Sequence, residues 1–116
     1  MDIWQGGRRR ATINDFGDMT VDGHRCAHIS DGGRLLVNGA SRGDVTASGD
    51  IYWDGRRRGN VTDWGDLYID GQRIGQLTDS GDIYLNGRRW GHVSQCDPKS
   101  RRHQLVAFLI AFAGIV

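Results

Sequence analysis

The sequence has no glutamate, and it has only one lysine (Lys99) and one proline (Pro98) among its 116 residues. All fourteen acidic residues are therefore aspartate. Aspartate prefers turns because its short carboxylate binds nearby backbone amides, whereas glutamate favours helices. This choice of acid indicates that most of the chain is not helical.

Cysteine and net charge are also scarce. Two cysteines, Cys26 and Cys96, are too few for a disulfide framework, so we expect reduced thiols. The net charge of +1 provides no global positive field, and nucleic acid is not an expected partner. The first ten residues lack a basic segment followed by an apolar one, which predicts a cytoplasmic protein.

What the chain does have is a repeat of sixteen residues. Residues 65–77 read "GDLYIDGQRIGQL" and residues 81–93 read "GDIYLNGRRWGHV". Six such blocks follow one another without insertions from residue 1 to residue 96. We call residues at the same position of successive blocks a column. The sixth and seventh columns predict a type I′ turn in every block, since both central residues of that turn need positive φ: Gly6-Gly7, Asp22-Gly23, Asn38-Gly39, Asp54-Gly55, Asp70-Gly71 and Asn86-Gly87.

A second turn ends each block, as in "TDWG" at 62–65, and it predicts a wider hairpin connection. The third and thirteenth columns are apolar throughout and form the predicted core: Ile3, Met19, Leu35, Ile51, Leu67 and Ile83, with Ile13, Ile29, Val45, Val61, Leu77 and Val93. Across the tight turn the third column should share a face with the tenth, so a flat meander would expose one apolar column. We therefore predict an all-β fold of six hairpins around a pseudo-symmetric axis.

These repeats resemble a known family. "NGRRWGHV", "DGQRIGQL" and "DGRRRGNV", each preceded by an Ile-Tyr or Leu-Tyr pair, resemble the bacterial β-flower repeat proteins, whose short hairpins radiate from a pseudo-symmetric centre. The resemblance implies a fold and no reaction, and it hints at a bacterial defence or conflict setting. "GDLYIDGQRIG" is less closely similar to the bactofilin β-solenoids, which polymerise into filaments. A solenoid would bury the arginines of the ninth column at a large cost.

The ninth column is mostly arginine, and its predicted cross-strand partner is the fourth column, which holds tyrosine in three blocks. One interpretation is a solvated ladder of cation–π and Asp–Arg contacts. The other is a site for a small anionic or nucleotide-like ligand. The candidate ligand-binding residues are Arg57, Arg73, Arg89, Tyr52, Tyr68 and Tyr84.

No other motif predicts chemistry. His24, Cys26 and His28 fall on one face of a predicted strand, but no fourth ligand is evident, and we predict neither a metal site nor a cofactor. A catalytic site would interrupt the repeat with singular polar residues, and we see no such interruption. The sequence therefore predicts a protein that is not an enzyme.

The tail departs from the repeat. We place a domain boundary between residues 1–96 and 97–116, where a basic segment precedes twelve uncharged, mostly apolar residues. As a helix these span about 18 Å, less than the roughly 30 Å of a bilayer core. Three interpretations remain: a membrane anchor at the inner face of the membrane, an oligomerisation helix, or a helix that plugs its own β-domain. For the first two, the contacting residues would be Arg101, Arg102, Leu105, Phe108, Leu109 and Phe112.

Together these features predict a non-enzymatic binding or sensing module that is tethered to a membrane or oligomerised through residues 105–116. The alternative is a bactofilin-like scaffold, which would assemble through exposed strand edges.

Overall fold

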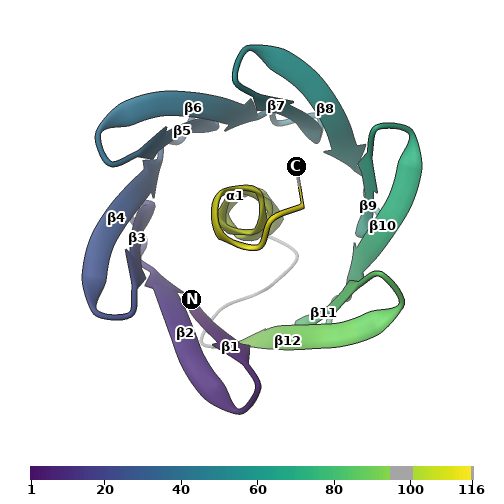
Figure 1. Cartoon of the computed structure of the whole chain (residues 1–116), viewed down its shortest axis with the longest axis horizontal. Helices are drawn as coiled ribbons and strands as arrows, with labels where there is room; N and C mark the ends of the chain where they lie inside the picture. Colours follow the sequence, from purple (N-terminus) through teal and green to yellow (C-terminus); the bar gives the residue numbers. More distant parts are fainter. Residues whose placement is uncertain (95–100, 116) are drawn as a thin grey trace.

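Twelve antiparallel strands form a closed barrel with one helix inside it (Figure 1). The structure is a computed structural model that describes residues 1–94 and 101–115. The predicted hairpins around an axis, followed by a C-terminal apolar helix, are confirmed. The elements are β1 (Asp2–Gln5), β2 (Arg8–Ile13), β3 (Asp18–Val21), β4 (His24–Ile29), β5 (Arg34–Val37), β6 (Ala40–Val45), β7 (Asp50–Trp53), β8 (Arg56–Val61), β9 (Asp66–Ile69), β10 (Gln72–Leu77), β11 (Asp82–Leu85), β12 (Arg88–Ser94) and α1 (Arg102–Phe112).

The tight turns have the predicted geometry. Asp54 and Gly55 have φ values of 52° and 80°, and the sixth and seventh residues of the other blocks also have positive φ. Because successive strands run in opposite directions, all six tight turns lie at one end of the barrel. We call it the tight-turn end.

The wider turns lie at the opposite end, which we call the wide-turn end. In the turn after β8, the Thr62 hydroxyl accepts a hydrogen bond from the Asp66 amide at 3.0 Å, and the Gly65 amide donates to the Thr62 carbonyl at 2.9 Å. Gly65 has a φ of 88°, and a Cβ there would collide with the Leu77 carbonyl oxygen. This position therefore requires glycine.

Each hairpin contains a β-bulge that the sequence did not predict. Ile51 lies opposite Gly59 and Tyr52 lies opposite Arg57, so Arg58 has no direct partner on β7. The same register shift occurs in the other five hairpins. The expectation that the third column shares a face with the tenth through direct pairing is therefore wrong, because the third pairs with the eleventh. This register brings both apolar columns to the inside of the barrel, and bulges also add the bend and twist that help a sheet to close.

The first and last strands close the ring. Ile3 of β1 lies opposite Val93 of β12, and the Trp4 indole donates to the Ser94 hydroxyl at 2.9 Å. A closed ring leaves no open edge among the described strands, and a scaffold that assembles through exposed strand edges stays a prediction.

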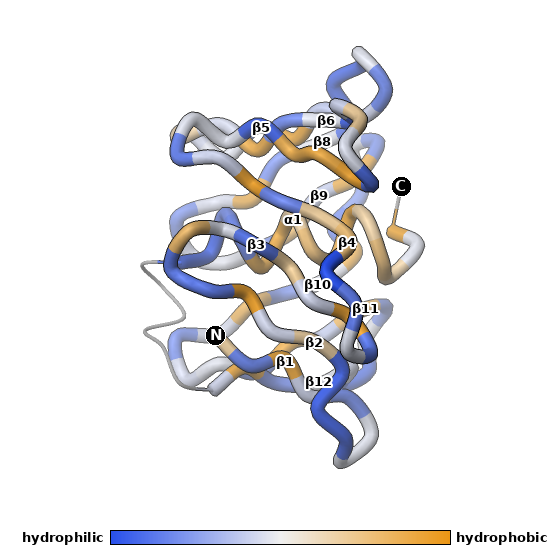
Figure 2. The backbone as a smooth tube through the Cα atoms, turned by 90° about the vertical axis from the view of Figure 1, so that its left-hand side faces the viewer, coloured by the Kyte–Doolittle hydropathy of each residue, from blue (hydrophilic) through white to orange (hydrophobic). Residues whose placement is uncertain are grey.

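Helix α1 lies inside the barrel and runs along its axis, so that Figure 1 shows the helix end-on and Figure 2 shows it from the side. All six residues from Leu105 to Ile110 are buried, and they share one core with the third and thirteenth columns. A helix that is apolar on every side suits a position surrounded by a barrel, whereas a surface helix needs a polar face. Of the three interpretations of the tail, the structure shows the helix that plugs its own β-domain.

The direction of α1 is set at both ends. At its start, Arg101 donates to the Asn14 carbonyl at 2.7 Å and Arg102 donates to the Asp63 carbonyl at 2.9 Å, both in wide turns. At its end, Arg10 donates to the Phe112 carbonyl at 3.4 Å. Arg101 and Arg102 stand at the positive end of the helix dipole, where Asp15 at 3.6 Å and Asp79 at 3.4 Å balance their charge. Arg10 lies near the negative end, where a positive charge is favourable.

Among residues 1–94 and 101–115, no helix has the length and apolar character needed to cross a membrane. The predicted domain boundary, together with Cys96, Pro98 and Lys99, lies outside the described residues. Cys26 is a free thiol, and burial raises the pKa of that thiol.

Candidate functional site

The predicted arginine and tyrosine residues are brought together as expected, but on the outside of the barrel. Arg57, Arg73 and Arg89 lie directly opposite Tyr52, Tyr68 and Tyr84. Each of these arginines also pairs with the aspartate of its own block: Arg57 with Asp50 at 3.1 Å, Arg73 with Asp66 at 3.1 Å and Arg89 with Asp82 at 3.2 Å.

This outer belt does not converge on one ligand. Its arginines point away from a convex wall, and Arg57 keeps 54% of its side chain exposed. Their charges are already balanced by aspartates, so the belt most resembles the solvated ladder weighed above. The cation–π contact in the described residues lies elsewhere, with Arg42 at 4.7 Å from the centre of the Trp53 ring.

The third block shows that the belt is balanced column by column. It has Arg34 where the other blocks have aspartate, and Arg34 lies directly opposite Asp44 in the β5–β6 register. Asp44 belongs to no acidic column of the repeat, and the register gives its position a reason: it lies opposite Arg34, whereas the equivalent position of the other blocks holds an uncharged residue or a histidine opposite aspartate.

The prediction that His24, Cys26 and His28 lie on one face of a strand is wrong because of the bulge. With Cys26 as the bulged residue, His24 and His28 turn to opposite faces of β4, since they lie opposite Val21 and Asp18 respectively. His28 Nδ1 lies 2.9 Å from Asp18 Oδ1, and Arg25 lies 2.7 Å from the same oxygen. Arg25 and then His28 lower the pKa of Asp18 to about 2. No cluster of three metal-binding side chains occurs in the described part of the chain.

The residues predicted to contact a membrane or a second chain are held by the barrel. Leu105, Phe108 and Leu109 are buried, Phe112 is half-buried, and Arg101 and Arg102 bind turn carbonyls. Contact of these residues with a membrane or another subunit stays a prediction, and for the apolar ones it would require α1 to leave the lumen.

A basic ring that the sequence analysis missed surrounds the tight-turn end. Directly opposite strand residues share a face, so Arg56 and Arg88 lie on the inner side with Trp53 and Leu85. The bulge turns the tenth column to the same side. The eighth and tenth columns together place six arginines at this end, against three turn aspartates (Asp22, Asp54 and Asp70): Arg8, Arg10, Arg42, Arg56, Arg58 and Arg88.

Only part of this basic ring is neutralised by the turns. Arg42 pairs with Asp54 at 3.0 Å and Arg58 pairs with Asp70 at 3.0 Å. Within the described residues, Arg8, Arg56 and Arg88 have no carboxylate partner. The charge that remains lies on the first and sixth blocks, which are neighbours in the ring, and on the fourth block, which lies opposite the first. The sequence reads "RRR" in the first and fourth of these blocks. Aligning the six blocks by column is the step that could have revealed the ring from the sequence.

A pocket of about 800 Å³ opens within this basic ring. Its apolar wall is made by Ile74, Leu85, Trp90 and Ile115, and Arg88 and Arg89 line its rim. One face of the pocket is formed by residues 113–115, which follow α1, and Trp90 is held in place because its ring lies 6.3 Å from Phe108 in an edge-to-face contact. The site therefore combines guanidinium groups with a fixed indole and aliphatic side chains.

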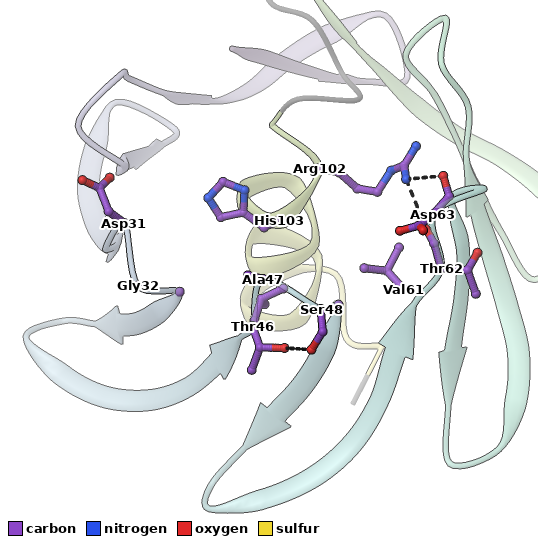
Figure 3. Close-up of a pocket in the computed structure, with 13 residues that line it drawn as sticks. Asp31, Gly32, Thr46, Ala47, Ser48, Val61, Thr62, Asp63, Arg102 and His103 are labelled. Atoms are coloured by element: carbon purple, nitrogen blue, oxygen red, sulfur yellow. Dashed lines mark hydrogen bonds between the residues drawn. The ribbon is translucent and has the colours of Figure 1, made fainter.

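A second pocket, of about 370 Å³, lies at the wide-turn end beside the start of α1 (Figure 3). It opens where the third block has Ala47, while other blocks have an aspartate such as Asp31 or Asp63. Figure 3 shows Arg102 bound to Asp63 and Thr62, and Thr46 bound to Ser48 at 3.0 Å. These polar groups already serve the turns.

His103 faces this second pocket. Burial, and to a lesser extent Arg101, lowers the pKa of His103, while Asp31 acts in the opposite direction. At neutral pH the imidazole is therefore uncharged. A neutral imidazole among occupied turn groups offers less to a charged ligand than the basic ring does.

Comparisons with models of protein families, with curated proteins and with solved structures each find no match to this chain. The resemblance to β-flower proteins and to bactofilins therefore stays a prediction. The candidate sites are the pockets at the two ends of the barrel.

Proposed function

We propose that this protein is a non-catalytic binding module whose tight-turn end takes an anionic ligand with a flat or apolar part. The observation that carries the proposal is the pocket in which Arg88, which has no carboxylate partner among the described residues, lies beside an apolar wall formed by Trp90 and Ile74. Arg89 also lines this pocket and is paired with Asp82. Guanidinium groups bind phosphate or carboxylate through paired hydrogen bonds, and an indole offers a surface for stacking.

The site replaces the outer belt as the candidate for ligand binding. Arg89 belongs to both, whereas Arg57 and Arg73 line no part of the tight-turn pocket. The lining of the pocket contains no carboxylate, imidazole or thiol, so it offers no group for acid–base or nucleophilic chemistry near neutral pH. This composition supports binding rather than a reaction.

The test is isothermal titration calorimetry with two probes, ATP and inorganic pyrophosphate, at low and high salt. We expect ATP to bind more tightly than pyrophosphate because only ATP has a base to stack on the apolar wall. R88Q should weaken ATP binding about tenfold, the effect of losing a hydrogen bond to a charged group. Added salt should weaken binding of both probes.

The matched control is the double variant R57Q/R73Q, which removes the same kind of side chain from the outer belt. We expect its ATP affinity to stay within about twofold of the wild-type value, since these arginines are exposed and paired with aspartate. Loss of ATP binding in this control, with R88Q unaffected, would return the site to the outer belt. Absence of binding for both probes would refute the proposal.

A further inference from the structure

The two ends of the barrel carry opposite charge. The tight-turn end has six arginines against three aspartates, as described above. The wide-turn end has four aspartates, Asp15, Asp31, Asp63 and Asp79, against Arg101, Arg102 and the N-terminal ammonium group, which donates to the Ile13 carbonyl. The outer wall between them is balanced through pairs such as Arg57–Asp50. The uneven charge of the described residues is therefore concentrated at the two ends.

The wide-turn end also carries exposed aromatic side chains. Trp64 is 84% exposed and Phe16 is 78% exposed, and they are the large apolar residues that the described structure leaves most open to water. Each directly follows an aspartate, Asp63 or Asp15, at the tip of a wide turn. An exposed tryptophan beside a carboxylate on a protruding turn is suited to enter an apolar pocket with a basic rim.

The tight-turn end of the same protein offers such a pocket. Its wall is apolar (Ile74, Leu85, Trp90 and Ile115) and its rim is basic (Arg88 and Arg89). We propose that the wide-turn end of a second copy of this chain docks on the tight-turn end, with Trp64 in the pocket and Asp63 facing Arg88. This inference rests on the proposed function, because it names an anionic partner for the same site.

The shape of the barrel permits this contact. Six similar hairpins give both ends a pseudo-sixfold arrangement, so rotating one copy by sixths of a turn presents each wide turn in succession to the sixth-block pocket (Figure 1). The contact joins two different surfaces, so a stack of any length keeps one free tight-turn end and one free wide-turn end, to which further copies can bind. Unless it is limited, association yields a stack whose axial repeat is somewhat longer than the 23 Å short dimension of the chain.

The experiment measures sedimentation velocity of the full chain over a wide range of concentration. Wild-type protein should form a ladder of oligomers at low salt, and high salt should shorten it. W64S removes the docking side chain, and R88E places a negative charge opposite Asp63. Each variant alone should stay monomeric, with the circular-dichroism spectrum and thermal midpoint of the wild type.

Mixing the two variants tests the head-to-tail geometry directly. W64S keeps an intact tight-turn end and R88E keeps an intact wide-turn end, so an equimolar mixture should form heterodimers and nothing larger. A mixture that remains monomeric, or W64S protein that still forms the ladder, would overturn the inference. Saturating ATP should dissolve the wild-type ladder, and a ladder that resists ATP would also overturn it.

Calorimetry with ATP separates this inference from the proposed function. W64S should bind ATP as the wild type does, whereas R88E should lose ATP binding as well as association. Wild-type protein that binds ATP but stays monomeric at every concentration would overturn the stacking contact and leave the binding site standing. Protein that neither binds ATP nor associates would overturn both.

Discussion

The ring of Trp90 meets the ring of Phe108 edge to face, with centroids 6.3 Å apart and planes inclined by 63°. This contact joins the barrel wall to the helix inside it. Phe108 is fully buried and also packs on Phe112 at 5.4 Å. The barrel and α1 therefore form one core, and the stability of each depends on the other.

Replacing Phe108 with alanine should test this dependence. The substitution leaves a cavity between α1 and the wall, and large-to-small changes of this kind cost about 3–5 kcal/mol of unfolding free energy. Urea unfolding followed by circular dichroism measures the loss. Phe16→Ala, at an exposed turn, should change stability by less than about 0.5 kcal/mol. Equal stability of the two variants would mean that α1 does not fill the lumen.

The wide turns provide a second matched pair. Gly65→Ala forces a side chain into positive φ and against the Leu77 carbonyl, so we expect a loss of about 1–3 kcal/mol. Gly32→Ala lies in an equivalent turn at ordinary φ, and its Cβ would only touch Ser30 at 3.8 Å, so it should be nearly neutral. Thermal unfolding of both variants checks the comparison, and similar midpoints would contradict the turn geometry.

Stability should fall as the pH drops below neutral because of His103. Burial lowers the pKa of His103 in the folded protein, so the unfolded chain takes up the proton first, near pH 6.5. Folding stability therefore decreases as pH falls below that value and stops decreasing below the folded pKa. His103→Gln should flatten the dependence of the thermal midpoint on pH between about 7 and 5. A variant with the slope of the wild type would assign the effect to another group.

The Arg34–Asp44 pair of the third block predicts a charge-swap result. Arg34→Asp places like charges opposite each other, since Arg34 faces Asp44 across the strands, and should cost about 0.2–1 kcal/mol. Asp44→Arg should cost a similar amount. The double variant R34D/D44R restores opposite charges and should recover most of the loss. Additive losses in the double variant, measured by urea unfolding, would show that the two side chains do not interact.

The turns of this fold could be predicted from sequence because their requirement is local. Positive φ at Asp54 and Gly55 depends on these two residues alone, and an Asn/Asp-Gly pair directly predicts positive φ at both positions. The bulge at Arg58 could not be predicted in the same way, because it depends on which residue of β7 lies opposite Gly59. Without the bulge, the tenth column was assigned no common role and the basic ring was missed.

The position of α1 could not be decided from sequence for a different reason. An apolar stretch such as Leu105–Ile110 must be buried, but a bilayer, another subunit and a barrel lumen all bury it. The choice depends on the width of the lumen, which follows from the number of strands and their stagger once the sheet closes. The repeat predicts the number of strands, but neither their stagger nor the closure of the sheet can be read from the repeat alone.

A single helix lacks the pseudo-sixfold symmetry of the barrel around it. The six repeats therefore face different side chains of the helix and are not equivalent. In the tenth column, Trp90 meets Phe108, Arg10 reaches the last carbonyl of α1, and Ile74 packs on the shared core. These three units therefore meet the helix and the core around it through different side chains. Exchanging two of these hairpins would keep every turn and every strand pair, but the side chains that line the lumen would no longer match the surface of α1.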